Sequence, residues 1–269
     1  MTPVVLGAVG YLNARPLVHG LAGRSPFALR FDVPSRCADL LHEGAIDLGL
    51  IPSIEYLRSP VIAGQTADYA IVPGLAIVSH GPVASVMLYA TKPLRQVRSI
   101  ALDTSSRSSV ALTRVLCDKA FGIRPRFEPH GPDLASMLAR CDAALVIGDN
   151  ALFIDPAVLS VSATDLGEAW TRLTGLPFVY AFWAGRPGAV SSEDVQALVE
   201  ARDTGVLAID EIAREYFPGE PDRQAAGARY LRDNIQYGLG PEEQAGLELF
   251  YRYAAEAGVV TSRRDVRFY

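Results

Sequence analysis

The stretch Val4-Val5-Leu6-Gly7-Ala8-Val9-Gly10-Tyr11-Leu12-Asn13-Ala14-Arg15-Pro16-Leu17 indicates how this chain folds. Residues 4–9 are apolar, as in a buried strand, and a polar turn begins at Gly10, after which apolar residues recur at helical spacing. A strand that leads through a tight polar turn into a helix is typical of an α/β sheet, whose ligands bind at the carboxyl ends of the strands. The helix start offers free N–H groups to an anion. Asn13 is therefore either a ligand-binding residue or only a helix cap.

The same order of strand, polar turn and helix start occurs at three further places. These turns are Pro52-Ser53, Thr104-Ser105-Ser106-Arg107 and Gly148-Asp149-Asn150. Strands that alternate with helices at this spacing are parallel and joined by right-handed crossovers. The cycles at residues 4–56 and 99–152 resemble each other, which predicts two α/β lobes with two polar turns each.

Two apolar segments are expected to cross between the lobes. Residues 69–91 consist of β-type runs separated by turns with Gly and Pro, and residues 177–184 form a strongly apolar strand. The predicted division places residues 1–88 and 179–269 in lobe I and residues 89–178 in lobe II. A cleft between two such lobes is a natural site for a small molecule.

Two further features concern the second half of the chain. Residues 158–162 are predicted to form a short strand, and the chain is helical from Ser191 onward, where Ser191-Ser192-Glu193-Asp194 is a helix-start signal. The helical tail weakly disfavours the alternative fold, which is one continuous doubly wound sheet.

The composition excludes several classes of protein. The chain has 269 residues, 49% hydrophobic and 20% charged, with a net charge of -5, as in a soluble globular protein. This charge provides no basic surface for nucleic acid or for a membrane, so local groups must hold any anionic ligand. We see no signal peptide, lipidation motif or membrane span, and we expect a cytoplasmic protein. No pattern sets an oligomeric state.

We expect neither a metal nor a cofactor. The cysteines Cys37, Cys117 and Cys141 form no CxxC pair and indicate small buried residues in a reducing compartment. The four histidines have no metal-binding spacing, and neither GxxxxGK[ST] nor GxGxxG is present.

The turn at residues 104–109 is the strongest candidate for anion binding, because its hydroxyls and the N–H groups of the next helix can hold a carboxylate or a phosphate. The alternative is a serine-rich helix cap whose hydroxyls meet water. Ser85 lies in no GxSxG motif, so it is not a nucleophile-elbow serine, and alone it indicates an ordinary strand serine. Asp149 is a base, a residue that orients Asn150, or a structural cap.

Six segments together resemble one known family. They are Gly10–Leu17, Leu50–Tyr56, Gly81–Val86, Ala101–Val110, Ile147–Leu152 and Thr174–Val179. In this order, from about residue 4 to 184, the chain resembles the chorismate dehydratases of the futalosine route to menaquinone. The sister enzyme of that route, which forms a dihydroxynaphthoate, has a similar fold but a Ser-Pro-Cys-Pro-Asn-Asp-type start that this chain lacks.

The resemblance implies a two-lobed fold like that of type II periplasmic binding proteins. It also implies a reaction in which chorismate loses water to give 3-[(1-carboxyvinyl)oxy]benzoate, with Asn13 and Ser85 in the active site. The residues that we expect to bind the substrate are Tyr11, Ser53, Thr104, Ser105, Ser106, Arg107, Gly148 and Asp149.

The chemistry of this substrate fits polar turns that are mostly uncharged. Chorismate is a dianion, and a ring carboxylate held at the Ser105–Arg107 turn would favour the charge that develops there. Asn13 and Ser85 would position the leaving hydroxyl or the enolpyruvyl group. Because no histidine is an obvious base, we hypothesise that the substrate's own enolpyruvyl carboxylate takes the C3 proton.

Two other functions remain open at this stage. The first is a small-anion solute-binding protein without chemistry, because the fold alone does not separate receptor from enzyme. The missing signal peptide argues against it. The second is the sister naphthoate-forming enzyme of the same pathway.

Overall fold

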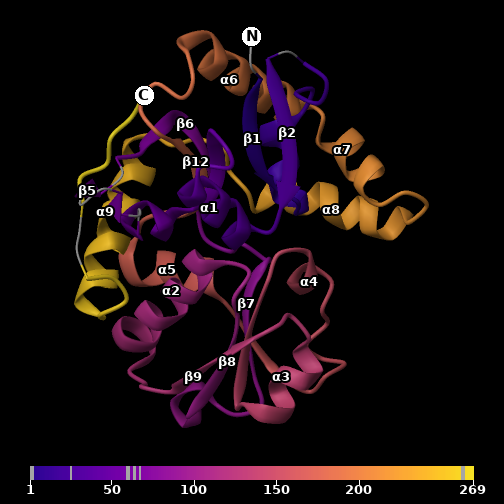
Figure 1. The fold of residues 1–269 in the computed structure, drawn as a ribbon. Coiled ribbons are helices and arrows are strands. Elements are labelled where there is room, and N and C mark those ends of the chain that lie inside the picture. Colours follow the sequence, from indigo (N-terminus) through magenta and orange to yellow (C-terminus); the bar gives the residue numbers. More distant parts are fainter. Residues whose placement is uncertain (1–2, 25, 59–60, 63–64, 67, 262–263) are drawn as a thin grey trace.

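The computed structural model describes residues 3–24, 26–58, 61–62, 65–66, 68–261 and 264–269. Two five-stranded sheets form two lobes, one above the other in Figure 1, with helices around each sheet. The first sheet contains β1 (Val4–Val9), β2 (Phe27–Asp32), β3 (Leu48–Pro52), β6 (Ala70–Ser79) and β12 (Phe178–Gly185). The second contains β7 (Val86–Ala90), β8 (Ser99–Asp103), β9 (Arg126–His130), β10 (Ala143–Ile147) and β11 (Ser162–Asp165). A separate pair joins β4 (Val61–Ile62) to β5 (Gln65–Thr66).

Helices connect and cover these strands. The α-helices are α1 (Pro34–Glu43), α2 (Arg107–Leu116), α3 (Leu134–Arg140), α4 (Asp149–Leu152), α5 (Leu166–Thr174), α6 (Ser192–Leu207), α7 (Ile209–Tyr216), α8 (Pro221–Asp233) and α9 (Pro241–Glu256). The short 3-10 helices are η1 (Leu12–Val18), η2 (Ser53–Arg58) and η3 (Leu94–Gln96), and a π-helical turn, η4 (Cys117–Phe121), extends α2.

The two sheets repeat one topology. The strand orders are β2-β1-β3-β12-β6 and β9-β8-β10-β7-β11. In each sheet the first three strands are parallel, and the fourth runs antiparallel to its neighbours. The carboxyl ends of β1 and β3 therefore face those of β8 and β10, and the four polar turns of the sequence meet between the lobes. The predicted two-lobed α/β fold is confirmed, and a single continuous sheet is not formed.

The crossing segments follow from the pairing of β6, β7 and β12. Among the described residues, β6 pairs in the first sheet and β7 in the second, so the chain first crosses between Ser79 and Val86. The strand β12 pairs again in the first sheet. The division at residues 88 and 179 stays a prediction.

Two strand predictions need correction. The predicted break at Pro73 and Gly74 lies inside the continuous strand β6, where an irregular register against β12 accommodates a proline that has no N–H to donate. The predicted strand at 158–162 is wrong for most of its length, because the strand begins only at Ser162. Ser160 has a φ of 52°, a left-handed conformation that ends an extended run, and Val158 is 78% exposed.

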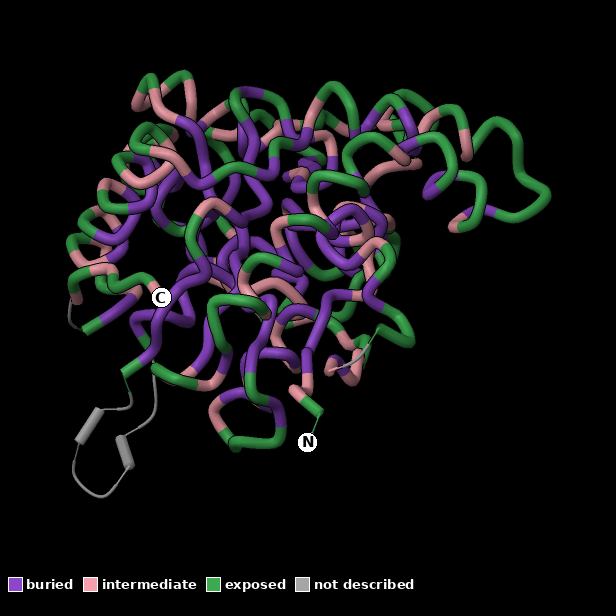
Figure 2. The backbone as a smooth tube through the Cα atoms, turned by 90° about the horizontal axis from the view of Figure 1, so that it is seen from above, coloured by how far each residue is buried: buried purple, intermediate pink, exposed green. Residues whose placement is uncertain are grey.

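The C-terminal helices support the first polar turn. Figure 1 shows α6, α7 and α8 beside β1 and β2, and Figure 2 shows buried backbone in the interior of the molecule with exposed backbone mostly at its periphery. A Cβ atom at Gly205 of α6 would lie 2.2 Å from the carbonyl oxygen of Pro16, so α6 packs directly against the backbone of η1. In the same way a Cβ at Gly227 of α8 would lie 3.0 Å from a methyl group of Leu12. The helical tail thus fixes the position of η1 and of the turn before it.

Candidate active site

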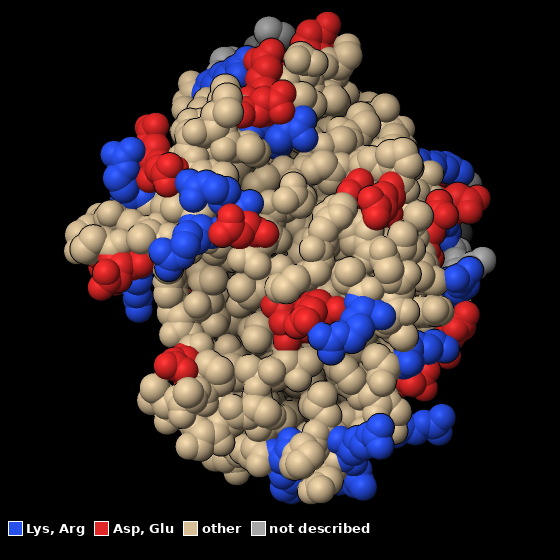
Figure 3. Space-filling view, turned by 180° about the vertical axis from the view of Figure 1, so that it is seen from behind, with Lys and Arg blue, Asp and Glu red and all other residues tan. Residues whose placement is uncertain are grey.

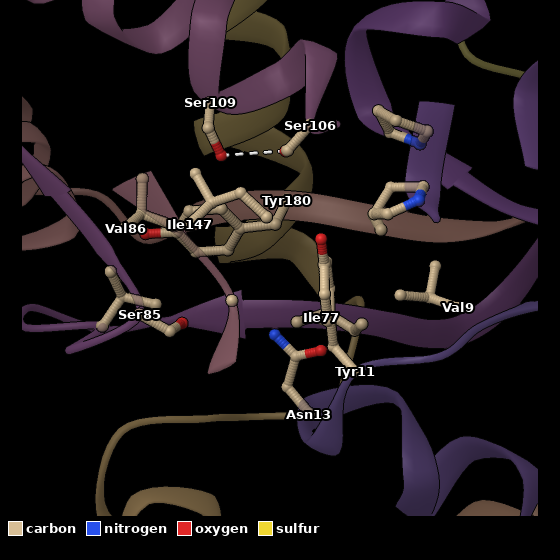
Figure 4. Close-up of a pocket in the computed structure, with 15 residues that line it drawn as sticks. Val9, Tyr11, Asn13, Ile77, Ser85, Val86, Ser106, Ser109, Ile147 and Tyr180 are labelled. Carbon is tan, nitrogen blue, oxygen red and sulfur yellow. Dashed lines mark hydrogen bonds between the residues drawn. The ribbon is translucent and has the colours of Figure 1, made fainter. Parts of the chain in front are cut away.

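A cleft lies where the polar turns of the two lobes meet, and it encloses about 460 Å³ of empty space including its mouth. Figure 4 shows Ser106 and Ser109 on one wall, Asn13 on the opposite wall and Tyr11 between them. The residues that line the cleft are Val9, Tyr11, Asn13, Pro34, Pro52, Ile77, Val83, Ser85, Val86, Ser106, Ser109, Ile147, Gly148, Tyr180 and Ala181. Within the described part of the chain, no lining residue has an acidic, basic or imidazole side chain.

Tyr11 connects the lobes on one side of the cleft. Its hydroxyl lies 3.2 Å from Oγ of Ser105, whose own hydroxyl donates to Asp103 at 2.7 Å. Its ring lies against Gly148, where an added Cβ atom would meet the ring carbons at 3.0 Å. Gly148 has φ 64° and ψ -147°, a conformation that glycine alone adopts readily. Burial raises the pKa of the Tyr11 hydroxyl, which therefore stays protonated.

Asp149 makes a second connection between the lobes. Its Oδ1 accepts the backbone N–H of Leu12 at 3.2 Å, and its Oδ2 accepts the hydroxyl of Tyr216 in a short hydrogen bond. The Tyr216 hydroxyl also lies 3.0 Å from the carbonyl oxygen of Gly10. Burial raises the pKa of Asp149, while the hydrogen bonds from Tyr216 and Leu12 and the charge of Arg15 oppose that rise. The first N–H of η1 is thus taken by this carboxylate.

Asn13 and Ser85 are joined through a residue of the helical tail. Asn13 Nδ2 donates to the hydroxyl of Tyr230 at 3.1 Å, and that hydroxyl donates to Oγ of Ser85 at 2.7 Å. The Oδ1 atom of Asn13 is buried without a hydrogen-bond partner among the described residues.

The backbone that presents Ser85 is strained and held from the side. Ala84 has a φ of 60°, which is unfavourable for a residue with a Cβ atom. The carboxylate of Asp165 accepts the N–H groups of Val83 at 3.0 Å and Ala84 at 2.7 Å and stabilises this conformation. Asp165 also caps α5, so the turn before Ser85 is attached to a helix start.

The first turn of α2 forms the other wall. The hydroxyls of Ser106 and Ser109 lie 2.9 Å apart, and the N–H of Val110 makes the first backbone hydrogen bond, to Ser106. The preceding N–H groups of the helix have no acceptor within the helix and attract an anion. No side chain caps this helix, although serine stands at the cap position.

Several predicted site residues lie behind these walls. Ser53 is buried, donates to the carbonyl oxygen of Val179 at 2.7 Å and lies 3.1 Å from Oγ of Ser108. Thr104 is exposed. Of the predicted residues, those among the lining residues are Tyr11, Asn13, Ser85, Ser106 and Gly148, and those outside them are Ser53, Thr104, Ser105, Arg107 and Asp149.

The side chain of Arg107 pairs with two protein carboxylates and is not among the residues that line the cleft. Its Nη1 lies 2.9 Å from Oε2 of Glu55, and its Nη2 lies 2.8 Å from Oδ1 of Asp39. Both carboxylates belong to lobe I, so they already balance the positive charge of the Arg107 guanidinium, which belongs to the other lobe. A substrate carboxylate at this turn would therefore meet Ser106, Ser109 and N–H groups, and direct binding by Arg107 stays a prediction.

The surface features are consistent with a small-molecule site. On the face in Figure 3, most acidic side chains lie in clusters with basic ones, basic side chains alone lie at the lower end, and large areas between carry neither charge. Among the described residues no helix is both long and apolar enough to cross a membrane. One group that could hold a metal, His80 with Glu242 and Glu243, contains no residue of the cleft, and His80 lies 2.8 Å from Glu243.

A family model described as menaquinone biosynthesis matches residues 4–256. The chain belongs to the menaquinone biosynthesis family. Chorismate dehydratase of Thermus thermophilus is 32% identical over 273 residues, which cover 93% of this chain and 94% of that protein. The family resemblance that the six sequence segments indicated is thereby confirmed.

Solved structures support the fold of this menaquinone biosynthesis family member. A protein from Archaeoglobus fulgidus has a TM-score of 0.72 at 16% identity, with 96% of this chain and 98% of that chain covered. The periplasmic aliphatic sulphonate binding protein of Escherichia coli has a TM-score of 0.66 at 17% identity, with 99% and 96% covered. At these identities the likeness shows the fold alone, and it confirms the predicted periplasmic-binding-protein-like architecture.

Three residues of this family member that shape the cleft carried no signal in the sequence. Tyr180, Tyr216 and Tyr230 stand in an apolar strand and in amphipathic helices, where tyrosine is an ordinary core residue. Tyr180 lines the cleft, and burial raises the pKa of its hydroxyl well above the usual value. Only the folded chain brings the hydroxyls of Tyr216 and Tyr230 to the polar turns and that of Tyr180 to Ser79.

Proposed function

We propose that this protein is a lyase that removes water from chorismate to give 3-[(1-carboxyvinyl)oxy]benzoate, in the futalosine-dependent synthesis of menaquinone in the cytoplasm. The Thermus thermophilus relative is a chorismate dehydratase and covers nearly the whole chain. The observation that carries the proposal is a cleft between the lobes with an otherwise apolar lining, whose polar side chains are hydroxyls and the amide of Asn13, without a charged side chain among its described lining residues. Such a cleft suits a dianion whose reaction needs hydrogen-bond donors.

The α2 wall is suited to the ring carboxylate of the substrate. The hydroxyls of Ser106 and Ser109 and the free N–H groups of the first turn would donate to its oxygens. When the C3 proton leaves, negative charge spreads through the ring diene onto this carboxylate. Donors already in place stabilise that charge more than they stabilise the ground state.

The substrate supplies its own base in this mechanism. The C3–H bond breaks, and its proton moves to the carboxylate of the enolpyruvyl group, which is attached to the same carbon through an ether oxygen. The C3=C4 bond then forms as the C4–O bond breaks, and the departing hydroxide takes up the proton from the enolpyruvyl carboxyl group to become water, which regenerates the carboxylate. Aromatisation of the ring drives the second step, and no described lining residue is needed as a base.

Asn13 and Ser85 would act on the leaving hydroxyl. They stand on the wall opposite α2 and are linked through Tyr230, so both side chains have fixed orientations. The amide of Asn13 and the hydroxyl of Ser85 would orient the C4–O bond, and the Ser85 hydroxyl would donate to its oxygen as charge develops. The predicted residues Ser53, Ser105 and Asp149 do not line the cleft and would instead hold the lining residues in position.

The test is direct incubation with chorismate. Purified protein should convert chorismate to an aromatic product, followed by absorbance and identified by chromatography against synthetic 3-[(1-carboxyvinyl)oxy]benzoate. The Asn13→Ala variant should lose about 100-fold or more in kcat. Asn234→Ala is the matched control, because the half-buried Asn234 does not line the cleft and, among the described residues, its side chain donates to the carbonyl oxygen of Pro82.

Two outcomes would favour other functions. Tight binding of chorismate with no product would favour a solute-binding protein. Turnover of the cyclic nucleoside substrate of the sister naphthoate-forming enzyme, without turnover of chorismate, would favour that reaction. Normal chorismate turnover by Asn13→Ala would remove this asparagine from the mechanism.

A further inference from the structure

A buried tyrosine of the C-terminal helical region links Asn13 and Ser85, two of the polar residues that line the cleft. Tyr230 lies on α8, is 3% exposed and is not among the residues that line the cleft. Its hydroxyl accepts Asn13 Nδ2–H at 3.1 Å and donates to Ser85 Oγ at 2.7 Å. The hydroxyl oxygen of Tyr230 therefore sets the orientation of both side chains. Asn13 lies after β1 in the first lobe, and Ser85 lies in the segment that crosses between the lobes.

The direction of these hydrogen bonds fixes which atoms face the substrate. The hydroxyl of Tyr230 has a single proton, and that proton is used on Ser85. Since Ser85 accepts there, its own proton remains available for the cleft that it lines. Since Asn13 donates through Nδ2, its Oδ1 is left as an acceptor, and this atom is buried with no partner among the described residues.

We propose that Tyr230 is a positioning residue that makes Ser85 a hydrogen-bond donor and Asn13 an acceptor toward the leaving C4 hydroxyl group of the substrate. This inference rests on the proposed dehydration of chorismate. The substrate hydroxyl would donate its proton to Asn13 Oδ1 and accept the proton of Ser85 on its oxygen. The buried acceptor on Asn13 then gains a partner only when substrate is bound, which favours substrates with a hydroxyl at C4.

The surroundings of Tyr230 keep it in this role. Burial raises the pKa of its hydroxyl above the usual value, while its hydrogen bonds with Ser85 and Asn13 oppose the rise and the carboxylates Asp149 and Asp165 add to it. The hydroxyl therefore remains protonated, and the donor to Ser85 persists at every pH at which the enzyme is assayed. The helix α8 is itself fixed against η1 at Leu12, one residue before Asn13.

The experiment compares three residues at position 230 in the full-length protein. Tyr230→Phe removes one oxygen atom and should lower kcat about 10- to 100-fold, with KM changed less than about threefold, because Tyr230 does not touch the substrate. Tyr230→p-aminophenylalanine restores a donor toward Ser85 and should regain most of the lost kcat. The aromatic ring packs in the same way in both variants. If Tyr230 acted only through packing, the two variants would therefore have the same kcat.

Two controls make the result specific. Tyr237→Phe removes a buried hydroxyl that has no partner among the described residues and should leave kcat unchanged. In the Ser85→Ala background, Tyr230→Phe should have a clearly smaller effect than in the unmodified enzyme, because one of its two targets is already absent.

The outcomes separate this inference from the proposed function. If the unmodified protein forms no aromatic product, the proposed function fails. If it forms product and Tyr230→Phe keeps the full kcat, or loses activity by the same factor with and without Ser85, the positioning role is overturned. A loss that p-aminophenylalanine fails to restore overturns it equally.

Discussion

Arg107 Nη1 lies 2.9 Å from Oε2 of Glu55, and this ion pair joins the start of α2 in one lobe to η2 in the other. The Glu55 side chain is 2% exposed and also accepts from Arg58 at 3.0 Å and lies 3.3 Å from His42 Nε2. The arginine that the sequence placed at an anion site thus holds the lobes together beside that site. The pair fixes α2 while leaving its first N–H groups free.

Removing the charge of Glu55 should destabilise the folded protein. In Glu55→Gln, Arg107 and Arg58 lose a buried carboxylate partner, and we expect the free energy of unfolding to fall by about 2 kcal/mol. Urea unfolding at neutral pH measures this. Glu200→Gln is the control, because its pair with Arg24 is 49% and 46% exposed and should contribute less than about 0.5 kcal/mol. Equal losses in the two variants would contradict the prediction.

The same carboxylate predicts how stability depends on pH. Burial alone would raise the pKa of Glu55, but the hydrogen bond from His42 and the charges of Arg107 and Arg58 lower it overall below the usual 4.5. A lowered pKa in the folded state means that the stabilisation is complete above pH 4.5 and is lost as pH falls through the folded-state pKa. Between pH 5 and pH 3 (roughly the carboxyl range), unfolding free energies should fall less steeply for Glu55→Gln than for the unmodified protein. Parallel curves would show that Glu55 does not contribute.

Asp149 offers a test of whether its charge or its hydrogen bonds matter. Asp149→Asn keeps an oxygen for the N–H of Leu12 and a polar group for Tyr216, so kcat/KM should stay within about threefold. Asp149→Ala loses both contacts between the lobes, and kcat/KM should fall about tenfold, equivalent to one buried hydrogen bond. Steady-state kinetics with chorismate measure both. Equal, large losses in Asn and Ala variants would instead make Asp149 a catalytic base.

The sequence was sufficient for the fold because the relevant signals are local. Each strand, polar turn and helix start is contiguous, so Gly10–Asn13 and Gly148–Asn150 could be recognised without knowledge of the rest. Parallel strands then require that such turns share one edge of a sheet. The strand at 158–162 was misplaced because its apolar residues imitate a buried strand, while the left-handed Ser160 ends the extended run.

The partners of the polar residues were not predictable in the same way. Arg107 lies 52 positions from Glu55, and Tyr230 lies 217 positions from Asn13, so nothing in the local pattern links them. A tyrosine in an amphipathic helix has the same pattern whether its hydroxyl meets solvent or Ser85. The sequence therefore identifies the turns that form the cleft but not the hydrogen bonds that aim their side chains.

Substitution of Gly148 should lower activity for a reason other than strain in its backbone. In Gly148→Ala the new Cβ atom would press on the ring of Tyr11 at 3.0 Å, which pushes the lobes apart and should lower kcat/KM at least about tenfold. Gly74→Ala is a matched control, because Gly74 has a similar positive φ of 72° and nothing within 4 Å of an added Cβ atom. Both variants should lose about 1 kcal/mol or more of stability from backbone strain, and only the first should lose activity. Loss of activity in both would mean that general destabilisation is the cause.

The identity of the base can be tested on the substrate. A chorismate analogue whose enolpyruvyl carboxylate is replaced by a neutral amide has almost the same shape but no group to accept the C3 proton. Because no described lining residue of the cleft carries an acidic or imidazole side chain, no protein group there would take over this role. We expect kcat for the amide to fall about 1000-fold or more, the upper range of a general-base contribution, while the amide still competes with chorismate for binding. Rapid quench with the two substrates side by side measures the step, and turnover of the amide at the full rate would require a base supplied by the protein.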